Sequence, residues 1–264
     1  MRRGHRMEVP ANSAQSWIAA FTGSYDDAEL DLLLSYIRRS SFVLDVGASL
    51  GFYAIPLAKA VKDLGGRLVA VEPVHGNCQV LRRNIALNGL GDVVSLLPVA
   101  LGDKEERVLL HIETGGTGNA TIVSGLDPSQ VAHHDRQGGT GTAEHADVRR
   151  LDNVELPVDG PAQACSLLKM DVEGFEMEML EGASQFIAAH RPVIFGEFHP
   201  VWFETRGIDP SEPQRWAETN RYDCMELVYA RRHRFLDLEK ITLRPLGRDG
   251  ARSGTSLLLL PTAD

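Results

Sequence analysis

The sequence has 264 residues, of which 43% are hydrophobic and 24% charged, and a chain of this kind buries a core without disulfide or metal staples. Its 36 acidic and 27 basic residues give a formal net charge of -9, which argues against a protein that grips the phosphates of nucleic acid. The three cysteines form no zinc or disulfide pattern, and no signal peptide or membrane-length apolar run is recognisable, so we expect a cytoplasmic protein.

The first part of the sequence predicts a small helical cap over residues 1–40. Apolar side chains spaced three and four apart give residues 26–38 one apolar face, which is the pattern of an amphipathic helix. This face consists of Leu30, Leu33, Leu34 and Ile37. The apolar stretch 16–21 (SWIAAF) predicts a second, shorter helix ahead of it.

From residue 41 on, short apolar segments alternate with helical patterns. Strands are expected at residues 41–46, 67–73, 93–101, 166–172 and 192–198. Helices are expected at residues 51–65, 75–89 and 173–190. This alternation predicts a mostly parallel sheet with helices on both faces. Residues 222–230 and 254–261 predict two more strands with no full helix between them, so these are expected to pair antiparallel at one edge.

Residues 112–150 break this rhythm and predict a long loop insertion. The segment is rich in Gly, Thr, Asp and His. Two interpretations remain open, because long loops in compact domains are either functional, such as a lid over a site, or unstructured. Its histidines, His133, His134 and His145, show no ligand spacing, so no metal site is expected from them.

The turn after the first strand, VLDVGASLGFYA, predicts a ligand site. The dinucleotide pattern GxGxxG fails, because Ser49 and Phe52 stand where its second and third glycines would follow Gly47. The small residues and the following helix start still favour a nucleotide-like ligand. Asp45 at the entrance of the turn would repel a pyrophosphate and suits a cationic group, although Asp is also a common turn residue.

The second strand ends in an acid, Glu72, that lies 21 residues after Gly51. An acid at this distance suits a ribose, because its two oxygens accept hydrogen bonds from both hydroxyls. S-adenosylmethionine contains a ribose and a cationic group but no pyrophosphate, so it fits both expectations. We therefore expect S-adenosylmethionine as the cofactor.

Four segments in order, VLDVGASLGFYA, VEPVHGNCQVLRRNIALNG, VALGD and LLKMDVEGFEMEMLEGA, resemble the FkbM-type S-adenosylmethionine-dependent methyltransferases. The resemblance runs over residues 25–200, apart from the long loop. It implies a Rossmann-like class I methyltransferase fold with a seven-stranded, mostly parallel sheet and an antiparallel last strand. It makes residues 41–264 the catalytic domain. It also implies methyl transfer to a hydroxyl of a small molecule such as a sugar, glycolipid or secondary metabolite.

The resemblance also assigns site residues. The positions that match the family's cofactor site are Asp45, Gly47, Ala48, Gly51, Glu72, Ala100 and Leu101. Pro73 next to Glu72 is included with them, and Tyr53 is interpreted either as packing under the cofactor or as core. Asp171 and Glu173 match the acids of the DVEG motif, near the methionine end of the cofactor and the substrate.

Catalysis needs a base, because an alcohol attacks poorly while it keeps its proton. Glu197 and His199 end the next strand on one side, beside Asp171 and Glu173. The candidates for the base are His199 first, then Asp171 or Glu197. A divalent ion held by Asp171 and its neighbours is the alternative. Lys169, inside an apolar strand, is expected to neutralise a neighbouring acid.

Other functions compete with this interpretation. An NAD-dependent oxidoreductase shares the ribose acid, but the missing GxGxxG argues against it. A nucleic-acid methyltransferase usually carries an Asn/Asp-Pro-Pro-aromatic motif where this sequence has KMDVEG. A non-catalytic S-adenosylmethionine-binding module would be expected to lack the acids that follow the later strands.

Overall fold

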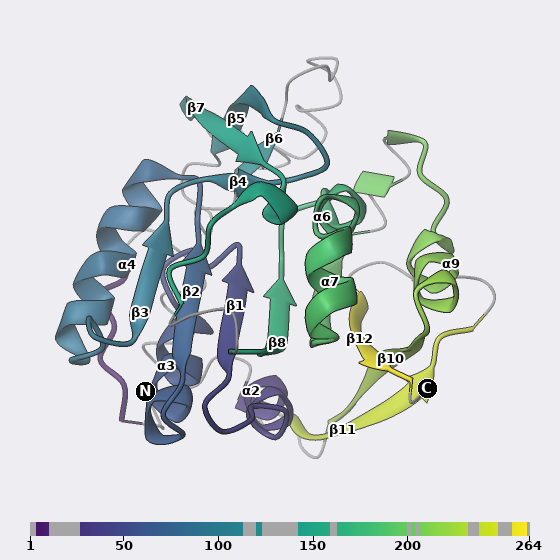
Figure 1. Cartoon of the computed structure of the whole chain (residues 1–264), viewed down its shortest axis with the longest axis horizontal. Helices are drawn as coiled ribbons and strands as arrows, with labels where there is room; N and C mark the ends of the chain where they lie inside the picture. The colour runs from purple at the N-terminus through teal and green to yellow at the C-terminus, as the bar shows by residue number, and fades with distance from the viewer. Residues whose placement is uncertain are drawn as a thin grey trace.

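The computed structural model describes nine ranges of the chain, and its core is a sheet of eight described strands (Figure 1). The ranges are residues 4–10, 27–112, 120–122, 142–158, 163–199, 202–203, 206–231, 238–247 and 255–262. The strand order is β11-β10-β12-β9-β8-β1-β2-β3. The strands are β1 (Phe42–Val46), β2 (Arg67–Val71), β3 (Val94–Leu97), β8 (Cys165–Met170), β9 (Val193–Phe198), β10 (Tyr222–Arg231), β11 (Leu238–Pro245) and β12 (Thr255–Pro261).

The centre of the sheet is parallel and one of its edges is antiparallel. β1 pairs in parallel with β2 and β8, which in turn pair in parallel with β3 and β9. The last strand, β12, runs antiparallel to both β9 and β10. The α/β class, the mostly parallel sheet and the antiparallel last strand are thereby confirmed.

The expected number of seven strands is corrected to eight. The additional strand, β11, pairs antiparallel with β10 at the edge of the sheet. Its apolar Ile241 and Leu243 alternate with polar residues and pack against the core, which is the pattern of a half-buried edge strand. The prediction overlooked this alternation because both of these apolar residues stand among charged ones.

Helices cover both faces of the sheet, as expected. One face carries α2 (Asp27–Leu34), α3 (Ala54–Asp63) and α4 (His75–Leu87). The other face carries α6 (Glu176–Gly182), α7 (Ser184–His190) and α9 (Glu212–Thr219), with the 3-10 turn η1 (Leu151–Asn153) beside them. Each set contributes buried apolar side chains to one of two large core clusters, so the sheet separates two hydrophobic layers.

A second, smaller sheet lies beyond the carboxyl ends of β1, β2 and β3 (Figure 1). Its order is β4-β7-β5-β6, from β4 (Ala100–Leu101), β5 (Glu106–Ile112), β6 (Ala120–Ile122) and β7 (Thr142–Arg149). Within the expected loop insertion at residues 112–150, β6 and β7 are strands. Residues 113–119 and 123–141, with His133 and His134, lie outside the described residues, and His145 lies in β7.

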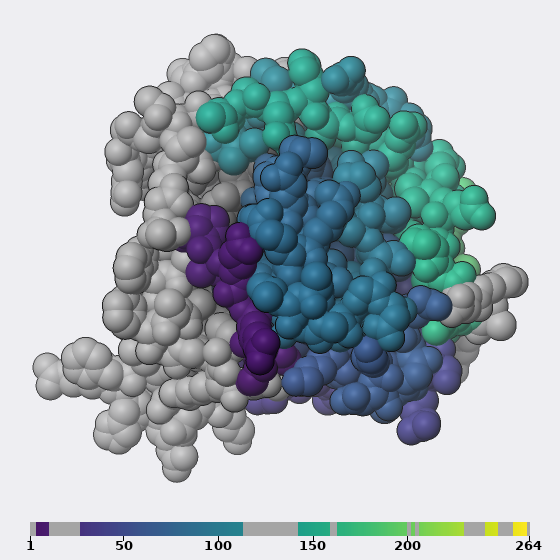
Figure 2. Space-filling model, turned by 90° about the vertical axis from the view of Figure 1, so that its left-hand side faces the viewer, coloured from purple at the N-terminus to yellow at the C-terminus, as the bar shows by residue number. Residues whose placement is uncertain are grey.

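The N-terminal part of the chain packs against the sheet domain. Helix α2 falls within the expected helix at residues 26–38, whereas the predicted helix at 16–21 lies outside the described residues. Residues 4–10 run along α4, where the amide of Asn84 donates hydrogen bonds to the carbonyls of Glu8, at 3.0 Å, and of Leu50, at 2.9 Å. Figure 2 shows this segment in purple against the blue surface of the α4 region.

The helices of the described ranges are all too short or too polar to cross a membrane. The division into a cap and a catalytic domain at residue 40 stays a prediction.

Candidate active site

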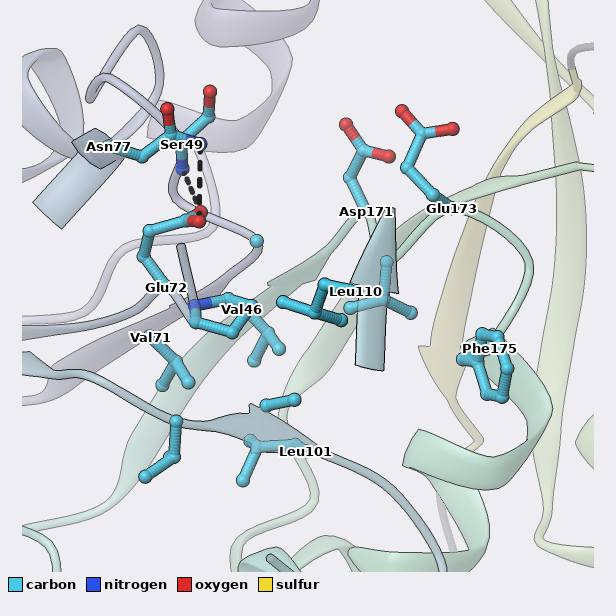
Figure 3. Close-up of a pocket in the computed structure, with 15 residues that line it drawn as sticks. Val46, Ser49, Val71, Glu72, Asn77, Leu101, Leu110, Asp171, Glu173 and Phe175 are labelled. Atoms are coloured by element: carbon cyan, nitrogen blue, oxygen red, sulfur yellow. Dashed lines mark hydrogen bonds between the residues drawn. The ribbon is translucent and has the colours of Figure 1, made fainter. Parts of the chain in front are cut away.

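A pocket lies between the carboxyl ends of β1, β2 and β8 and the small sheet (Figure 3). It has a volume of about 650 Å³ out to its open mouth. It is lined by Val46, Gly47, Ser49, Val71, Glu72, Pro73, Asn77, Val99, Ala100, Leu101, Leu110, Asp171, Val172, Glu173 and Phe175. Open α/β sheets bind ligands at this end of their strands.

Most of the predicted cofactor residues meet at this pocket. Those that line it are Gly47, Glu72, Pro73, Ala100, Leu101 and Asp171. The predicted residues outside its lining are Asp45, Ala48, Gly51 and Tyr53. The following contacts show the positions of Asp45, Gly51 and Tyr53 around the turn.

The turn between β1 and α3 depends on its two glycines. Gly47 has a φ of +74°, and a β-carbon on it would lie 1.9 Å from the carbonyl oxygen of Asp171. Gly51 has a φ of +98°, and a β-carbon there would lie 2.7 Å from a methyl carbon of Leu81 on α4. Gly47 therefore allows the turn to touch the end of β8, and Gly51 allows α4 to pack against the turn.

Asp45 is buried beneath the turn and pairs with Lys169 on the neighbouring strand. The carboxylate Oδ1 lies 3.2 Å from Nζ of Lys169, which also donates a hydrogen bond to the carbonyl of Gly47 at 3.1 Å. Burial raises the pKa of Asp45, although the charge of Lys169 opposes this. The expected structural role of Lys169 is confirmed, and a direct contact between Asp45 and a cofactor stays a prediction.

Tyr53 belongs to a polar network below the pocket. Its hydroxyl donates a hydrogen bond to the buried carboxylate of Glu29 on α2, and Nζ of Lys169 lies 5.2 Å from the centre of its ring. The hydroxyl of Tyr229 on β10 donates to the same Glu29. Tyr53 therefore links the N-terminal helix to the strands that carry the site.

Glu72 presents an oriented carboxylate to the pocket (Figure 3). Its Oε2 accepts a hydrogen bond from the backbone N–H of Ser49 at 2.8 Å. Its Oε1 accepts from the backbone N–H of Val74 at 2.9 Å and from the amide of Asn77 at 3.2 Å. Burial raises the pKa of Glu72 to about 7, and these hydrogen bonds oppose the rise. The three donors hold the carboxylate in one orientation.

The opposite wall of the pocket is apolar. It comes from Ala100 and Leu101 of β4, Val99 before them and Leu110 of β5. Leu110 packs in the core of the small sheet and reaches the pocket from there. A flat heterocycle such as adenine suits a wall of this kind, because apolar side chains cover its faces.

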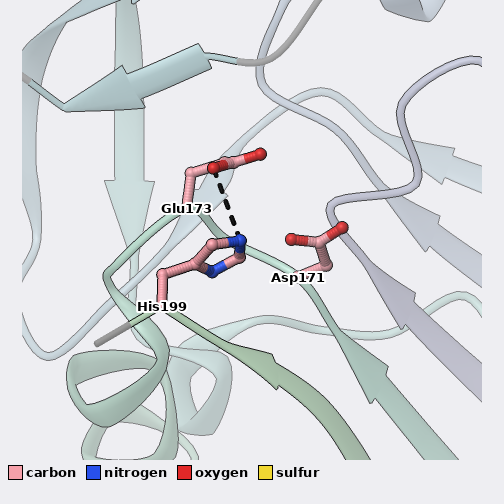
Figure 4. Close-up of side chains that lie close together, drawn as sticks. All are labelled: Asp171, Glu173 and His199. Atoms are coloured by element: carbon pink, nitrogen blue, oxygen red, sulfur yellow. Dashed lines mark ion pairs between the residues drawn. The ribbon is translucent and has the colours of Figure 1, made fainter. Parts of the chain in front are cut away.

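A cluster of acids around one histidine lies at the rim of the pocket (Figure 4). Asp171 and Glu173 follow the end of β8. Glu197 lies near the end of β9, and His199 directly follows that strand. Nε2 of His199 lies 3.6 Å from the carboxylate of Glu173 and 3.8 Å from that of Glu197. The four predicted catalytic residues therefore lie together. Glu176, the first residue of α6, joins them, because Nδ1 of His199 donates a hydrogen bond to it at 3.0 Å.

The charges of this cluster shift the titration of its members. Burial and the charge of Asp171 raise the pKa of Glu173 to about 8 and that of Glu197 to about 7. Burial lowers the pKa of His199, but the hydrogen bond to Glu176 and the charge of Glu173 outweigh burial and raise it to about 10. The raised pKa of His199 favours the protonated imidazole at neutral pH.

The DVEG turn that carries this cluster has an unusual backbone. Glu173 has a φ of +51° and Gly174 a φ of +96°, so two successive residues are left-handed. A β-carbon on Gly174 would lie 2.4 Å from the side chain of Trp202. Left-handed non-glycine residues are costly and are concentrated at functional sites, which fits the position of Glu173.

The prediction missed several residues of the site. Ser49 and Asn77 orient Glu72, Leu110 covers the pocket, and Glu176 orients His199. Ser49 has a detectable signal, because it stands inside the glycine turn. Glu176 has none, because Glu178 stands in the same first turn of α6, and the contact of Glu176 with His199 is recognisable only once α6 is placed beside β9.

Comparison with known proteins places this site in a family. The model of the methyltransferase FkbM domain matches residues 45–226. The chain is 29% identical to Methyltransferase sdnD of Sordaria araneosa over 192 residues, which cover 67% of this chain and 72% of that protein. It is 26% identical to Methyltransferase 1 of Beauveria bassiana (strain ARSEF 2860) over 150 residues, which cover 54% of this chain and 58% of that protein.

Among solved structures, the chain is similar to a methyltransferase FkbM from Methylobacillus flagellatus KT. The two share 19% sequence identity with a TM-score of 0.48, over 84% of this chain. The present chain spans 43% of the length of that protein.

Proposed function

The chain belongs to the FkbM methyltransferase domain family, and on that basis we propose that it binds S-adenosylmethionine in the pocket and methylates a hydroxyl of a small-molecule acceptor. The observation that carries the cofactor proposal is the carboxylate of Glu72, held by three hydrogen-bond donors at the pocket wall. The ribose hydroxyls donate to this carboxylate. The adenine lies against the apolar wall of Ala100, Leu101 and Leu110.

The DVEG turn is proposed to lie near the methionine end of the cofactor. Gly47 allows the turn after β1 to touch the backbone of Asp171, so a sulfonium bound beside this turn would be close to that acid. A positive sulfonium is stabilised next to carboxylates by direct charge attraction. Asp171, which lines the same pocket, supplies this attraction.

The reaction is a displacement at carbon. The acceptor oxygen attacks the methyl carbon with a lone pair, the carbon–sulfur bond breaks, and its electrons stay on the sulfur of S-adenosylhomocysteine. The hydroxyl proton leaves to a base during the attack. The protein's main contribution is to align the acceptor oxygen with the methyl group.

We assign the base to Glu197 instead of His199. The imidazole has its Nδ1 on Glu176 and a pKa raised to about 10 by the surrounding acids, after burial has lowered it, so it already holds the proton that a base would accept. Glu197 has a pKa of about 7, raised by burial and the charge of Asp171, and its side chain is 47% exposed. A base with a pKa near the working pH, within reach of an acceptor, is efficient.

The acceptor is proposed by class only. It is a hydroxyl of a sugar, glycolipid or secondary metabolite that reaches the cluster from the open mouth of the pocket. The net charge of the chain agrees with a small-molecule acceptor over nucleic acid.

Isothermal titration calorimetry of the purified chain tests the cofactor proposal. We expect S-adenosylmethionine and S-adenosylhomocysteine to bind at one site and NAD to give no heat. Glu72→Ala should weaken both ligands by about tenfold to a hundredfold, because it removes two charge-assisted hydrogen bonds. Binding of NAD without binding of S-adenosylmethionine would contradict the proposal. The exposed change Glu212→Ala, on α9, is the matched control and should leave binding unchanged.

A further inference from the structure

Three potential metal ligands converge at the rim of the pocket (Figure 4). One carboxylate oxygen each of Asp171 and Glu173 and one ring nitrogen of His199 lie within 4.8 Å of one another. These residues come from two neighbouring parallel strands, since Asp171 and Glu173 follow β8 and His199 follows β9. The three ligand atoms are close enough together to bind one cation, and a bound cation would draw them closer to one another.

The histidine is oriented as a metal-binding histidine is. Its Nδ1 donates to Oε1 of Glu176 at 3.0 Å, and the same oxygen accepts the backbone N–H of Gly174 at 2.9 Å. The side chain of Glu176 is fully buried, so this arrangement is rigid. The remaining nitrogen, Nε2, faces the carboxylate of Glu173. Histidine ligands of metals typically donate their other ring N–H to a carboxylate in this way.

Two buried carboxylate oxygens next to the histidine have no hydrogen-bond donor. These are Oδ1 of Asp171 and Oε2 of the fully buried Glu176, and neither accepts a hydrogen bond from the described residues, although the charges of Lys169 and His199 act on Asp171. A buried anionic oxygen without a donor is expensive, because it has lost its water and gained nothing. A cation next to Asp171 compensates this cost directly. The hydrogen bonds of His199 do not reach that oxygen.

We propose that Asp171, Glu173 and His199 bind a divalent cation of the Mn²⁺ type, which in turn binds the oxygen of the methyl acceptor. Two carboxylates and one imidazole suit Mn²⁺, because hard oxygen ligands and a borderline nitrogen both belong to its range. Three protein ligands leave several coordination positions open. The inference rests on the proposed function and adds that the acceptor offers an oxygen to the ion.

The proposed cation and Glu197 have different roles toward the acceptor hydroxyl. A cation held by these residues would lower the pKa of a bound hydroxyl, and Glu197 beside His199 would accept its proton. The oxygen attacks the methyl carbon while the carbon–sulfur bond breaks. The carboxylate of Glu197 lies 3.8 Å from Nε2 of His199. It is therefore next to the proposed cation site, although it is not one of the three proposed ligands.

The experiment is a titration of metal-stripped protein with MnCl₂, followed by the loss of the electron paramagnetic resonance signal of free Mn²⁺. We expect one site per chain. Asp171→Asn and His199→Gln should each weaken binding by at least about tenfold, and Glu176→Gln by about tenfold to a hundredfold through the orientation of the ring. Asp92→Asn, an exposed carboxylate that pairs with Lys62 before β3, is the matched control and should bind Mn²⁺ like the unmodified chain.

Circular dichroism and thermal melting of each variant establish that it is folded, and S-adenosylmethionine binding is measured on the same metal-free samples. Cofactor binding without any Mn²⁺ binding overturns the metal inference and leaves the proposed function standing. Mn²⁺ binding that survives unchanged in both Asp171→Asn and His199→Gln overturns it too, because the ion would then lie elsewhere. Mn²⁺ binding without cofactor binding contradicts the proposed function alone.

Discussion

Asp45 and Lys169 face each other across β1 and β8, in register, with 3.2 Å between Oδ1 and Nζ. Both side chains are almost completely buried, and Nζ also holds the carbonyl of Gly47 at the start of the cofactor turn. The pair therefore connects the centre of the sheet to the turn that shapes the pocket. Asp45, a predicted cofactor residue, is also the partner of a buried lysine in the fold.

Removing the lysine alone should be strongly destabilising. Lys169→Met leaves the carboxylate of Asp45 buried without its counter-charge, and breaking a buried ion pair from one side costs about 3–5 kcal/mol. Urea unfolding followed by circular dichroism measures this loss. The double variant Asp45→Asn with Lys169→Met should regain part of it, because no charge is left unpaired. If both variants lost the same stability, the pair would not be the cause.

Gly47→Ala should disrupt the pocket. The added β-carbon would overlap the carbonyl of Asp171, and the left-handed φ of +74° adds a strain of about 1–2 kcal/mol. We expect a melting temperature lower by at least about 2–4 °C and loss of S-adenosylmethionine binding in calorimetry. Gly91→Ala is the matched control, because nothing lies within 4 Å of its added β-carbon. Normal cofactor affinity in Gly47→Ala would refute this account of the turn.

Ribose binding should depend on pH through Glu72. Burial raises the pKa of Glu72 to about 7, so the carboxylate that accepts the ribose hydroxyls forms only as pH rises through that value. Adenosine, which has no titrating group in this range, should bind about tenfold more tightly at pH 8 than at pH 6, in proportion to the ionised fraction. Calorimetry at both pH values measures this. A pH-independent affinity would show that the ionisation of Glu72 plays no part.

The same shift predicts the pH dependence of stability. The folded pKa of Glu72 is raised from 4.5 to about 7, so the folded chain holds this proton more tightly than the unfolded chain. The stability that this gives is fully present below pH 4.5 and is lost as pH rises toward 7. Unfolding experiments in urea between these pH values should show the decline for the ligand-free chain. In Glu72→Gln this component should be absent, and an unchanged slope would assign the decline to other groups.

His199 should be protonated in the metal-free chain at neutral pH. Burial lowers its pKa, but the hydrogen bond to Glu176 and the charge of Glu173 raise it to about 10. Imidazole proton shifts in nuclear magnetic resonance spectra measure this titration. Glu176→Gln, which removes the largest favourable interaction of the imidazolium, should lower the pKa markedly. A pKa near 6.5 in the unmodified chain would restore His199 as a candidate base.

The sequence predicts the sheet well where its patterns are local. Strands β1, β2, β8 and β9 are short apolar runs between helical patterns, and each of them forms. Glu72 and the DVEG acids are recognisable because they follow strands in a known order. These features depend on positions along the chain, which the sequence displays directly.

The rest depends on contacts between distant segments. Glu176 holds His199 across 23 residues, and Lys169 reaches Gly47 across 122 residues. The two strands within the expected loop, β6 and β7, pair with β5 instead of following a strand–helix rhythm. Such contacts depend on how distant segments pack together, so they cannot be predicted from the composition of one segment.

The place of β12 has a consequence for how the chain is made. β12 is the last strand in the sequence, but it lies between β9 and β10, which both precede it. On the ribosome, β9 and β10 cannot complete their pairing until residues 255–261 have emerged. Until then the growing chain exposes an unpaired edge of β9, which is a template for association with other chains. The strand that is made last is therefore the one that covers this edge of β9.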